Sequence, residues 1–231
     1  MNERQSNTLL RELVTLVQSL KPVMEQNYSK IRNAYHQEYG WPEFDPLRHE
    51  ISLCLLFGLS QAAITLTNHF LETLLKYVLI YHYSLLNEKK HSQVRGRAVD
   101  ALEEFTAEGL RLYGTNDLGK NINAACSQGL LTKPEKEQLH EFREAFRNAY
   151  GHADKEKTFG DASVPVQAIT VEDGSILGDQ SKVQSVVRFP IIQGLVQAMQ
   201  AERHAFPYFS YVDNLAREIL NNRLGKQRPN R

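Results

Sequence analysis

The chain has 231 residues, with 27 basic and 27 acidic side chains, so its formal net charge is zero. A global electrostatic field that steers the molecule toward nucleic acid is therefore excluded, and any RNA-binding site must be local. Hydrophobic residues make up 42% and charged residues 23%, as in a globular protein with one large core. The two cysteines, Cys54 and Cys126, lack the number and spacing of a disulfide framework or a metal site. We expect a cytoplasmic protein without a metal or another cofactor.

Residues 1–46 are predicted to form N-terminal helices that pack on the core. Leucine and valine recur at helical spacing over 8–20, and a second helical stretch follows Pro22 and runs towards Tyr39. Gly40, Pro42 and Pro46 then mark a loop.

Residues 47–86 form the most apolar segment, which predicts long helices interrupted near Gly58. The stretch 51–71 contains no Asp, Glu, Lys or Arg and is long enough to span a bilayer. It nevertheless holds several polar side chains that would each need a partner in lipid, and it continues directly into Glu72 and Lys76. We therefore expect a core helix and no membrane partner.

The next helices are predicted over 98–112 and 118–128, after a polar loop at 87–97. Thr132 followed by Glu135 is the pattern of a capping box and opens a helix that runs through Tyr150. Gly151 should end this helix, because glycine readily adopts the left-handed conformation of a C-terminal cap.

The character of the chain changes after this helix. Residues 158–190 are rich in β-branched residues and contain the turn signal Asp173-Gly174, which predicts a β-hairpin insertion. Helices over 191–204 and 208–224, separated by Pro207, lead into a basic tail. We therefore predict an all-α fold in one globular domain. It consists of N-terminal helices at 1–46, a helical core at 47–157, a small peripheral β-hairpin at 158–190, and C-terminal helices at 191–231. The basic residues of the last segment read as a solvated terminus; they are Arg217, Arg223, Lys226, Arg228 and Arg231.

Two polar lines stand out on the predicted helices. On 132–150 an apolar stripe of Leu139, Phe142 and Phe146 lies beside a polar ridge, which consists of His140, Arg143, Glu144 and Arg147. In an unbroken α-helix, five residues would place Arg147 and His152 about 140° apart, but a turn at Gly151 lets His152 fold back. The second line lies on the apolar helix and consists of Thr65, His69, Glu72 and Lys76.

The second line needs partners if it is buried, because an unpaired buried polar group costs about 1–3 kcal/mol. Glu72 has three alternatives: to pair with Arg147, to hold the His152 ring, or to bond to Lys76 one turn away.

The run Arg147-Asn148-Ala149-Tyr150-Gly151-His152 resembles the signature of the HEPN superfamily, an Arg, often followed by a polar residue, with a His four to six positions later. The segments that precede this run are also similar to parts of the family's fold. The segment 71–76 (LETLLK) is similar to the family's early long helix, and 129–131 with 141–143 is similar to the helix that carries the motif. The resemblance covers residues 47–154, a little under half of the chain.

This resemblance implies a HEPN-like helical bundle that forms a homodimer with a shared cleft. Many members are metal-independent endoribonucleases, often toxins or antiviral effectors, so RNA and an antitoxin or regulatory protein are the implied partners. His152 would act as the general base or acid, Arg147 would bind the scissile phosphate, and Asn148 would position the pair. His69, Glu72 and Arg143 would support them.

The sequence departs from one branch of the family. Some members carry a Tyr two residues after the His, where this chain has Asp154, so regulation by modification of that tyrosine is not supported. Asp154 also brings negative charge near an incoming phosphate. Two alternatives stay open: a catalytically inactive HEPN-like homodimer that binds a protein or nucleotide, and a structural helical domain. In the latter, His152 merely caps a helix and Arg147 pairs with Glu144.

Overall fold

The computed structural model describes residues 3–87, 98–148, 163–166, 182–185 and 190–226. Nearly all of these residues are helical, which confirms the predicted all-α class. The helices are α1 (Glu3–His36), α2 (Asp45–Leu56), α3 (Ser60–Leu86), α5 (Ala98–Tyr113), α6 (Leu118–Ser127), α7 (Lys133–Phe142) and α10 (Pro190–Glu218). Two π-helical turns, η1 (Arg143–Asn148) and η3 (Ile219–Arg223), directly follow α7 and α10.

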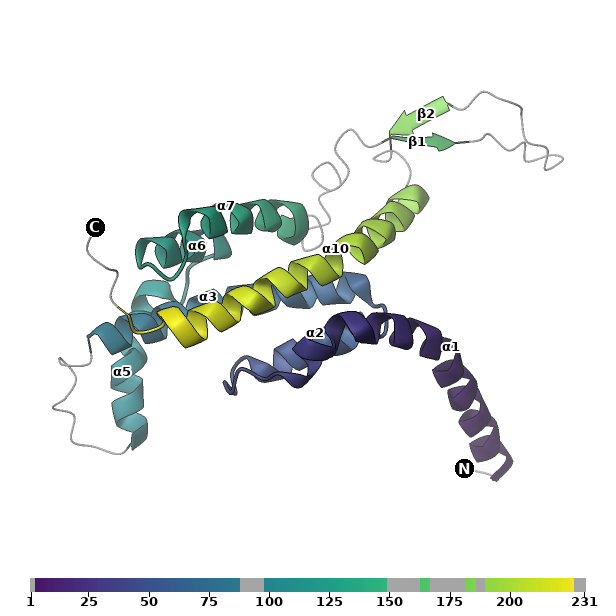
Figure 1. Ribbon diagram of the computed structural model, residues 1–231, viewed down its shortest axis with the longest axis horizontal. Coiled ribbons are helices and arrows are strands. Elements are labelled where there is room, and N and C mark those ends of the chain that lie inside the picture. Colours follow the sequence, from purple (N-terminus) through teal and green to yellow (C-terminus); the bar gives the residue numbers. More distant parts are fainter. Residues whose placement is uncertain (1–2, 88–97, 149–162, 167–181, 186–189, 227–231) are drawn as a thin grey trace.

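The central element is α3, which lies alongside α10 (Figure 1). In the same view α1 and α2 lie on one side of this pair and α6 and α7 on the other, while α5 crosses near the end of α3. Most apolar residues of α3 are buried, as the sequence predicted for a core helix. They include Ile64, Phe70, Leu71, Leu74, Leu75 and Val78. Within the described part of the chain, no helix is both long and apolar enough to cross a membrane.

The two breaks predicted at prolines are wrong, whereas the break at a glycine is right. Pro22 lies inside α1 and Pro207 inside α10. A proline removes one helical hydrogen bond and kinks the helix, but the residues around Pro207 remain helical because Ala205, Tyr208 and Phe209 are buried against other helices. Gly58 separates α2 from α3 with φ 74°, in the left-handed region that glycine tolerates.

Two short strands follow the helical core in sequence. β1 (Ser163–Val166) pairs antiparallel with β2 (Lys182–Ser185), so that Ser163 lies opposite Ser185. The remaining residues of the predicted hairpin at 158–190 lie outside the described residues, and so do most of the predicted loop at 87–97 and the predicted helix end at Gly151. The complete hairpin therefore stays a prediction.

A buried charged cluster joins the loop after α1 to α2 and α10. Asp213 accepts hydrogen bonds from Arg48 Nε at 2.6 Å and from the Tyr39 hydroxyl at 2.5 Å. The guanidinium carbons of Arg48 and Arg217 each lie 4.9 Å from the centre of the Tyr39 ring. Arg48 is only 2% exposed, and its Nη2 has no hydrogen-bond partner among the described residues. Burial, and next the Asp213 carboxylate, raise the pKa of Tyr39 far above its usual range, so this hydroxyl stays protonated and donates.

Candidate functional site

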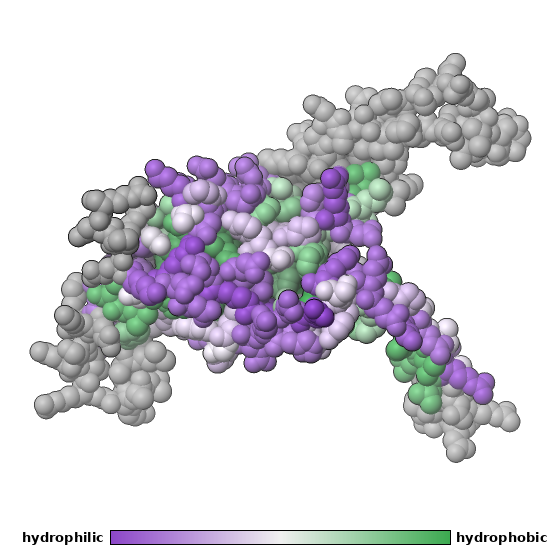
Figure 2. Space-filling model, viewed as in Figure 1, coloured by the Kyte–Doolittle hydropathy of each residue, from purple (hydrophilic) through white to green (hydrophobic). Residues whose placement is uncertain are grey.

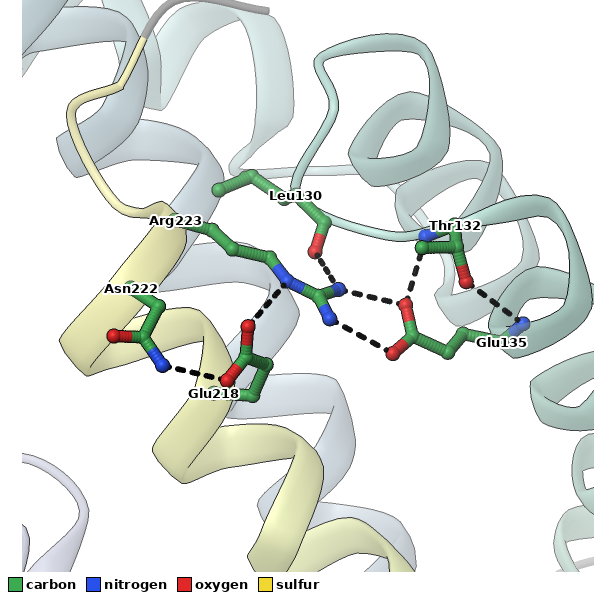
Figure 3. Close-up of polar contacts among 6 residues, drawn as sticks. All are labelled: Leu130, Thr132, Glu135, Glu218, Asn222 and Arg223. Atoms are coloured by element: carbon green, nitrogen blue, oxygen red, sulfur yellow. Dashed lines mark hydrogen bonds and ion pairs between the residues drawn. The ribbon is translucent and has the colours of Figure 1, made fainter.

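The helix that carries the HEPN-like motif begins with the predicted capping box. The Thr132 hydroxyl accepts from the Glu135 backbone N–H at 3.4 Å, and Glu135 Oε2 accepts from the Thr132 backbone N–H at 2.8 Å (Figure 3). The two side chains satisfy backbone donors that would otherwise lack partners, which fixes the start of α7.

Arg223 from η3 clamps this helix start. Its Nη1 and Nη2 donate to the two carboxylate oxygens of Glu135 at 2.7 and 3.0 Å, and Nη1 also donates to the Leu130 carbonyl at 3.0 Å (Figure 3). Glu218 accepts from Arg223 Nε at 3.3 Å. The prediction of a solvated basic tail is therefore wrong for Arg223, and also for Arg217, which pairs with Asp213 at 3.3 Å. Sequence reasoning missed the pair of Glu135 and Arg223 because 88 residues separate them. Asp213 and Arg217 are only four residues apart, so their pairing was available from helical spacing.

This clamp predicts an acid-sensitive contribution to stability. Burial raises the pKa of Glu135, but the hydrogen bonds from Arg223 and Thr132 outweigh burial and hold the pKa below its usual value. Because the folded-state pKa is depressed, the stabilisation is present above the unfolded pKa of about 4.3 and is lost as pH falls through the folded value. In urea unfolding, Glu135→Gln should cost about 1–2 kcal/mol at pH 7 and less below pH 4.

The exposed neighbour Glu137 on the same helix provides the control for this experiment. Glu137→Gln should change the free energy of unfolding by less than about 0.5 kcal/mol at either pH. An equal loss from Glu135→Gln at pH 7 and pH 3 would contradict a charge-dependent clamp.

The predicted apolar stripe anchors α7 and η1 on the core. Leu139 is fully buried, and Phe146 is 8% exposed. The rings of Phe142 and Phe146 stack on each other with centroids 5.7 Å apart, and both contact Tyr208 of α10, at 4.9 and 4.7 Å. The Tyr208 hydroxyl donates to Asn68 of α3 at 2.8 Å. This chain of contacts fixes the motif-bearing helix against both central helices.

Arg147 and Asn148 lie on a π-helical turn, which no sequence signal predicted. The backbone changes from α to π geometry at Arg143 and stays so through Asn148. A π-helical turn is a rare distortion that occurs frequently at functional sites. The side chains of Arg147 and Asn148, and the whole of His152 and Asp154, lie outside the described residues, so the proposed catalytic group stays a prediction.

Arg143 begins the same turn and packs against the start of α6. Its guanidinium contacts Gly119, beside the N-cap residue Asp117. Arg143 Nε is buried and has no hydrogen-bond partner among the described residues, and Arg143 Nη2 lies 3.8 Å from Glu144. The hydrogen bond from the Lys120 backbone N–H is the main reason that the pKa of Asp117 is lowered, and Arg143 adds to the shift. Sequence reasoning placed Arg143 on the correct ridge but missed α6 as its support.

Gly119→Ala should displace Arg143 at little cost in stability. A β-carbon at this position would overlap the Arg143 guanidinium, which is the movable end of a flexible side chain. Alanine also favours the helix by up to about 1 kcal/mol over glycine, so the free energy of unfolding should change by less than about 1 kcal/mol. The Arg143 Nε–H resonance in an NMR spectrum should shift.

Gly194→Ala in α10 is the matched control, because among the described residues the added carbon would meet no atom within 4 Å beyond its neighbours and the local helix backbone. It should leave the Arg143 resonance unchanged. A loss of more than 2 kcal/mol in Gly119→Ala would show that the guanidinium cannot move aside.

The line on α3 is less buried than the sequence suggested. Thr65 and His69 are exposed, and Glu72 and Lys76 are half-buried. The condition of burial is therefore met only in part, because Thr65 and His69 lie on the surface of α3. The supporting roles of His69 and Glu72 stay predictions, since Arg147 and His152 have no described side chains.

His140 adds a ring to the same face as Arg143. Its Nε2 lies 3.3 Å from the Asn123 side-chain oxygen. Burial, then the charges of Arg143 and Lys136, lower the pKa of His140, so the ring is neutral near pH 7. Across the described ranges, no group of three or more His, Cys, Asp or Glu is placed to hold a metal ion.

Comparison of the chain with protein-family models, with curated proteins and with solved structures gave no match.

Proposed function

We propose that this protein is a metal-independent endoribonuclease of the HEPN type, which acts on RNA in the cytoplasm as a homodimer. The observation that carries the proposal is that Arg147 and Asn148 lie on a π-helical turn directly after α7. Arg223 holds the start of α7, and Tyr208 contacts the aromatic rings near its end. A rigid support of this kind suits catalysis, since catalytic groups must be held within a fraction of an ångström of their working positions.

The proposed chemistry is transfer of protons at the RNA 2′-hydroxyl and the leaving oxygen by His152. An imidazole with a pKa near ~6.5 can serve as base and as acid near neutral pH. Arg147 binds the scissile phosphate through its planar fork and stabilises the charge that develops there. Arg143 begins the π-helical turn η1 and adds positive charge to it. Asn148 orients Arg147 and His152.

The test is cleavage of a mixed RNA pool by the purified protein in EDTA, beside a DNA pool of the same sequences. We expect RNA to be cut and DNA to remain intact, because the reaction needs the 2′-hydroxyl. Equal cutting of both pools would overturn the proposed chemistry. Loss of RNA cutting on chelation would overturn metal independence.

The second candidate is a catalytically inactive HEPN-like homodimer that binds a protein partner. The apolar face of α1 favours it, because Leu10, Leu13 and Val17 are more than half exposed among the described residues, which suits protein–protein contact, including contact between two copies of the chain. Toxin or defence roles, and an antitoxin or regulatory protein as partner, belong to either proposal. Failure of the protein to cut any RNA, together with capture of a defined protein by immobilised chain, would favour this candidate.

A further inference from the structure

The N-terminal half of α1 carries a wide apolar face that nothing described in the structure covers. Residues 8–20, named the α1 arm here, extend away from the helical body (Figure 1), and Pro22 follows them in the same helix. Figure 2 shows apolar side chains on this arm. Five large apolar residues of the arm are 48–61% exposed. They are Leu10, Leu13, Val14, Leu16 and Val17.

The exposed face continues a stripe that is buried further along the same helix. Apolar residues at 10, 13, 17, 20 and 24 follow the 3,4 spacing of a helix packed along one side, and the stripe continues at 31 after the polar Asn27. Met24 packs against the core and Ile31 is 1% exposed, whereas Leu10, Leu13 and Val17 have no such cover. The same helical surface therefore forms an interface at its C-terminal end and lacks one at its N-terminal end.

The spacing of the arm is self-complementary. The intervals between Leu10, Leu13, Val17 and Leu20 are three, four and three residues, which read the same in both directions. Two antiparallel copies can therefore place Leu10 opposite Leu20 and Leu13 opposite Val17, each pair occurring twice about a two-fold axis. A symmetric stripe of this kind fits a second copy of the same helix.

The charge of the arm also favours a second copy over a lipid surface. Between residues 8 and 20 the only charged side chains are Arg11 and Glu12. A helix that binds anionic membranes typically carries many Lys and Arg residues on its polar face, whereas this arm is neutral. Two neutral arms approach each other without net repulsion.

Apolar surface extends beyond the arm into an open groove of about 900 Å³ between α1, the α2–α3 connection and α10. Val23, Leu59 and Met199 line it and are 37–62% exposed. Val23 and Asn27 of α1 both line the groove, which therefore begins directly beyond the arm.

We propose that two copies of the chain associate through antiparallel pairing of their α1 arms. This interface involves residues outside the HEPN-like segment 47–154, and it goes beyond the proposed ribonuclease function. It can therefore exist whether or not the protein cuts RNA.

The first test is the molar mass of the full chain by light scattering across a concentration series. We expect a dimer for the wild type. Leu13→Asp and Val17→Asp should each raise the dimer dissociation constant at least about 30-fold, as expected for a substitution at the centre of an interface. Leu110→Asp is the control, because Leu110 is similarly exposed, at 49%, but lies on α5. A wild-type monomer, or a molar mass that is the same in both arm variants as in the wild type, would overturn the proposal.

The second test distinguishes the antiparallel register from a parallel one. Leu13→Cys and Val17→Cys are prepared separately in a chain with Cys54→Ser and Cys126→Ser, then oxidised alone and as a mixture. Antiparallel pairing predicts a disulfide-linked dimer in the mixture and little in either variant alone, because residue 13 faces residue 17. Dimers formed by each variant alone would indicate a parallel pair and overturn the proposed register. Unchanged circular dichroism in the arm variants shows that they remain folded.

Discussion

Asp213→Asn is expected to lower the free energy of unfolding by about 3–5 kcal/mol, the usual cost of removing one partner from a buried ion pair. Asp213 is the counter-charge of Arg48, which is 2% exposed, and it also pairs with Arg217. The amide keeps the shape of the carboxylate but removes its charge. Arg48 would then remain buried with an uncompensated positive charge, and its Nη2 already lacks a partner within the described part of the chain.

Two further variants separate the charge from the shape of this site. Arg48→Met combined with Asp213→Leu removes both charges and should recover much of the lost stability, since apolar replacement of a buried pair is often neutral or stabilising. Glu25→Gln breaks the exposed pair of Lys21 and Glu25 and should cost less than about 0.5 kcal/mol. Urea unfolding measures all three. A loss below 1 kcal/mol in Asp213→Asn would show that Arg48 does not depend on this carboxylate.

His152→Ala is expected to slow RNA cleavage by about 10²–10⁴-fold, the contribution of a positioned general acid or base. The wild-type rate should depend on pH because the imidazole must exchange protons, and the residual activity of the variant should lose that dependence. Arg147→Lys should also be strongly impaired although it keeps the charge, because lysine cannot present a planar, two-pronged donor to phosphate. Initial rates on one labelled RNA, from pH 5 to 9, measure these effects.

His49→Ala serves as the histidine control, because His49 is exposed on α2. Its activity should equal that of the wild type. Cleavage that survives His152→Ala with an unchanged pH profile would mean that another group catalyses the reaction, and the assignment of the motif would be wrong. Circular dichroism must show that every variant is folded.

Local patterns predicted the structure where neighbouring residues determine it. The capping box of Thr132 and Glu135 and the stripe of Leu139, Phe142 and Phe146 need only spacing, and both are found as predicted. The predicted helix break at Pro207 was wrong, because burial of Ala205 and Tyr208 outweighs the loss of one helical hydrogen bond at the proline. Other features have no local signature.

The charged pairs are features that have no local signature in the sequence. Arg48 and Asp213 lie 165 residues apart, and Glu135 and Arg223 lie 88 residues apart. Such pairs depend on how whole helices dock, which spacing along the chain does not determine. The π-helical turn at Arg143–Asn148 similarly depends on the fit of Phe142 and Phe146 against α10. The position of His152 relative to Arg147 remains a prediction for the same reason.

The clamp between Arg223 and Glu135 has a consequence for the order in which the protein matures during synthesis. Arg223 is added 88 residues after Glu135, which at 5–20 residues per second is roughly 4–18 s later. Until then the start of α7 has its capping box but no guanidinium to tie it to the end of α10. If the protein cuts RNA, the motif-bearing helix of the nascent chain therefore lacks this contact while synthesis continues, which delays activity among the ribosomal RNAs that surround it.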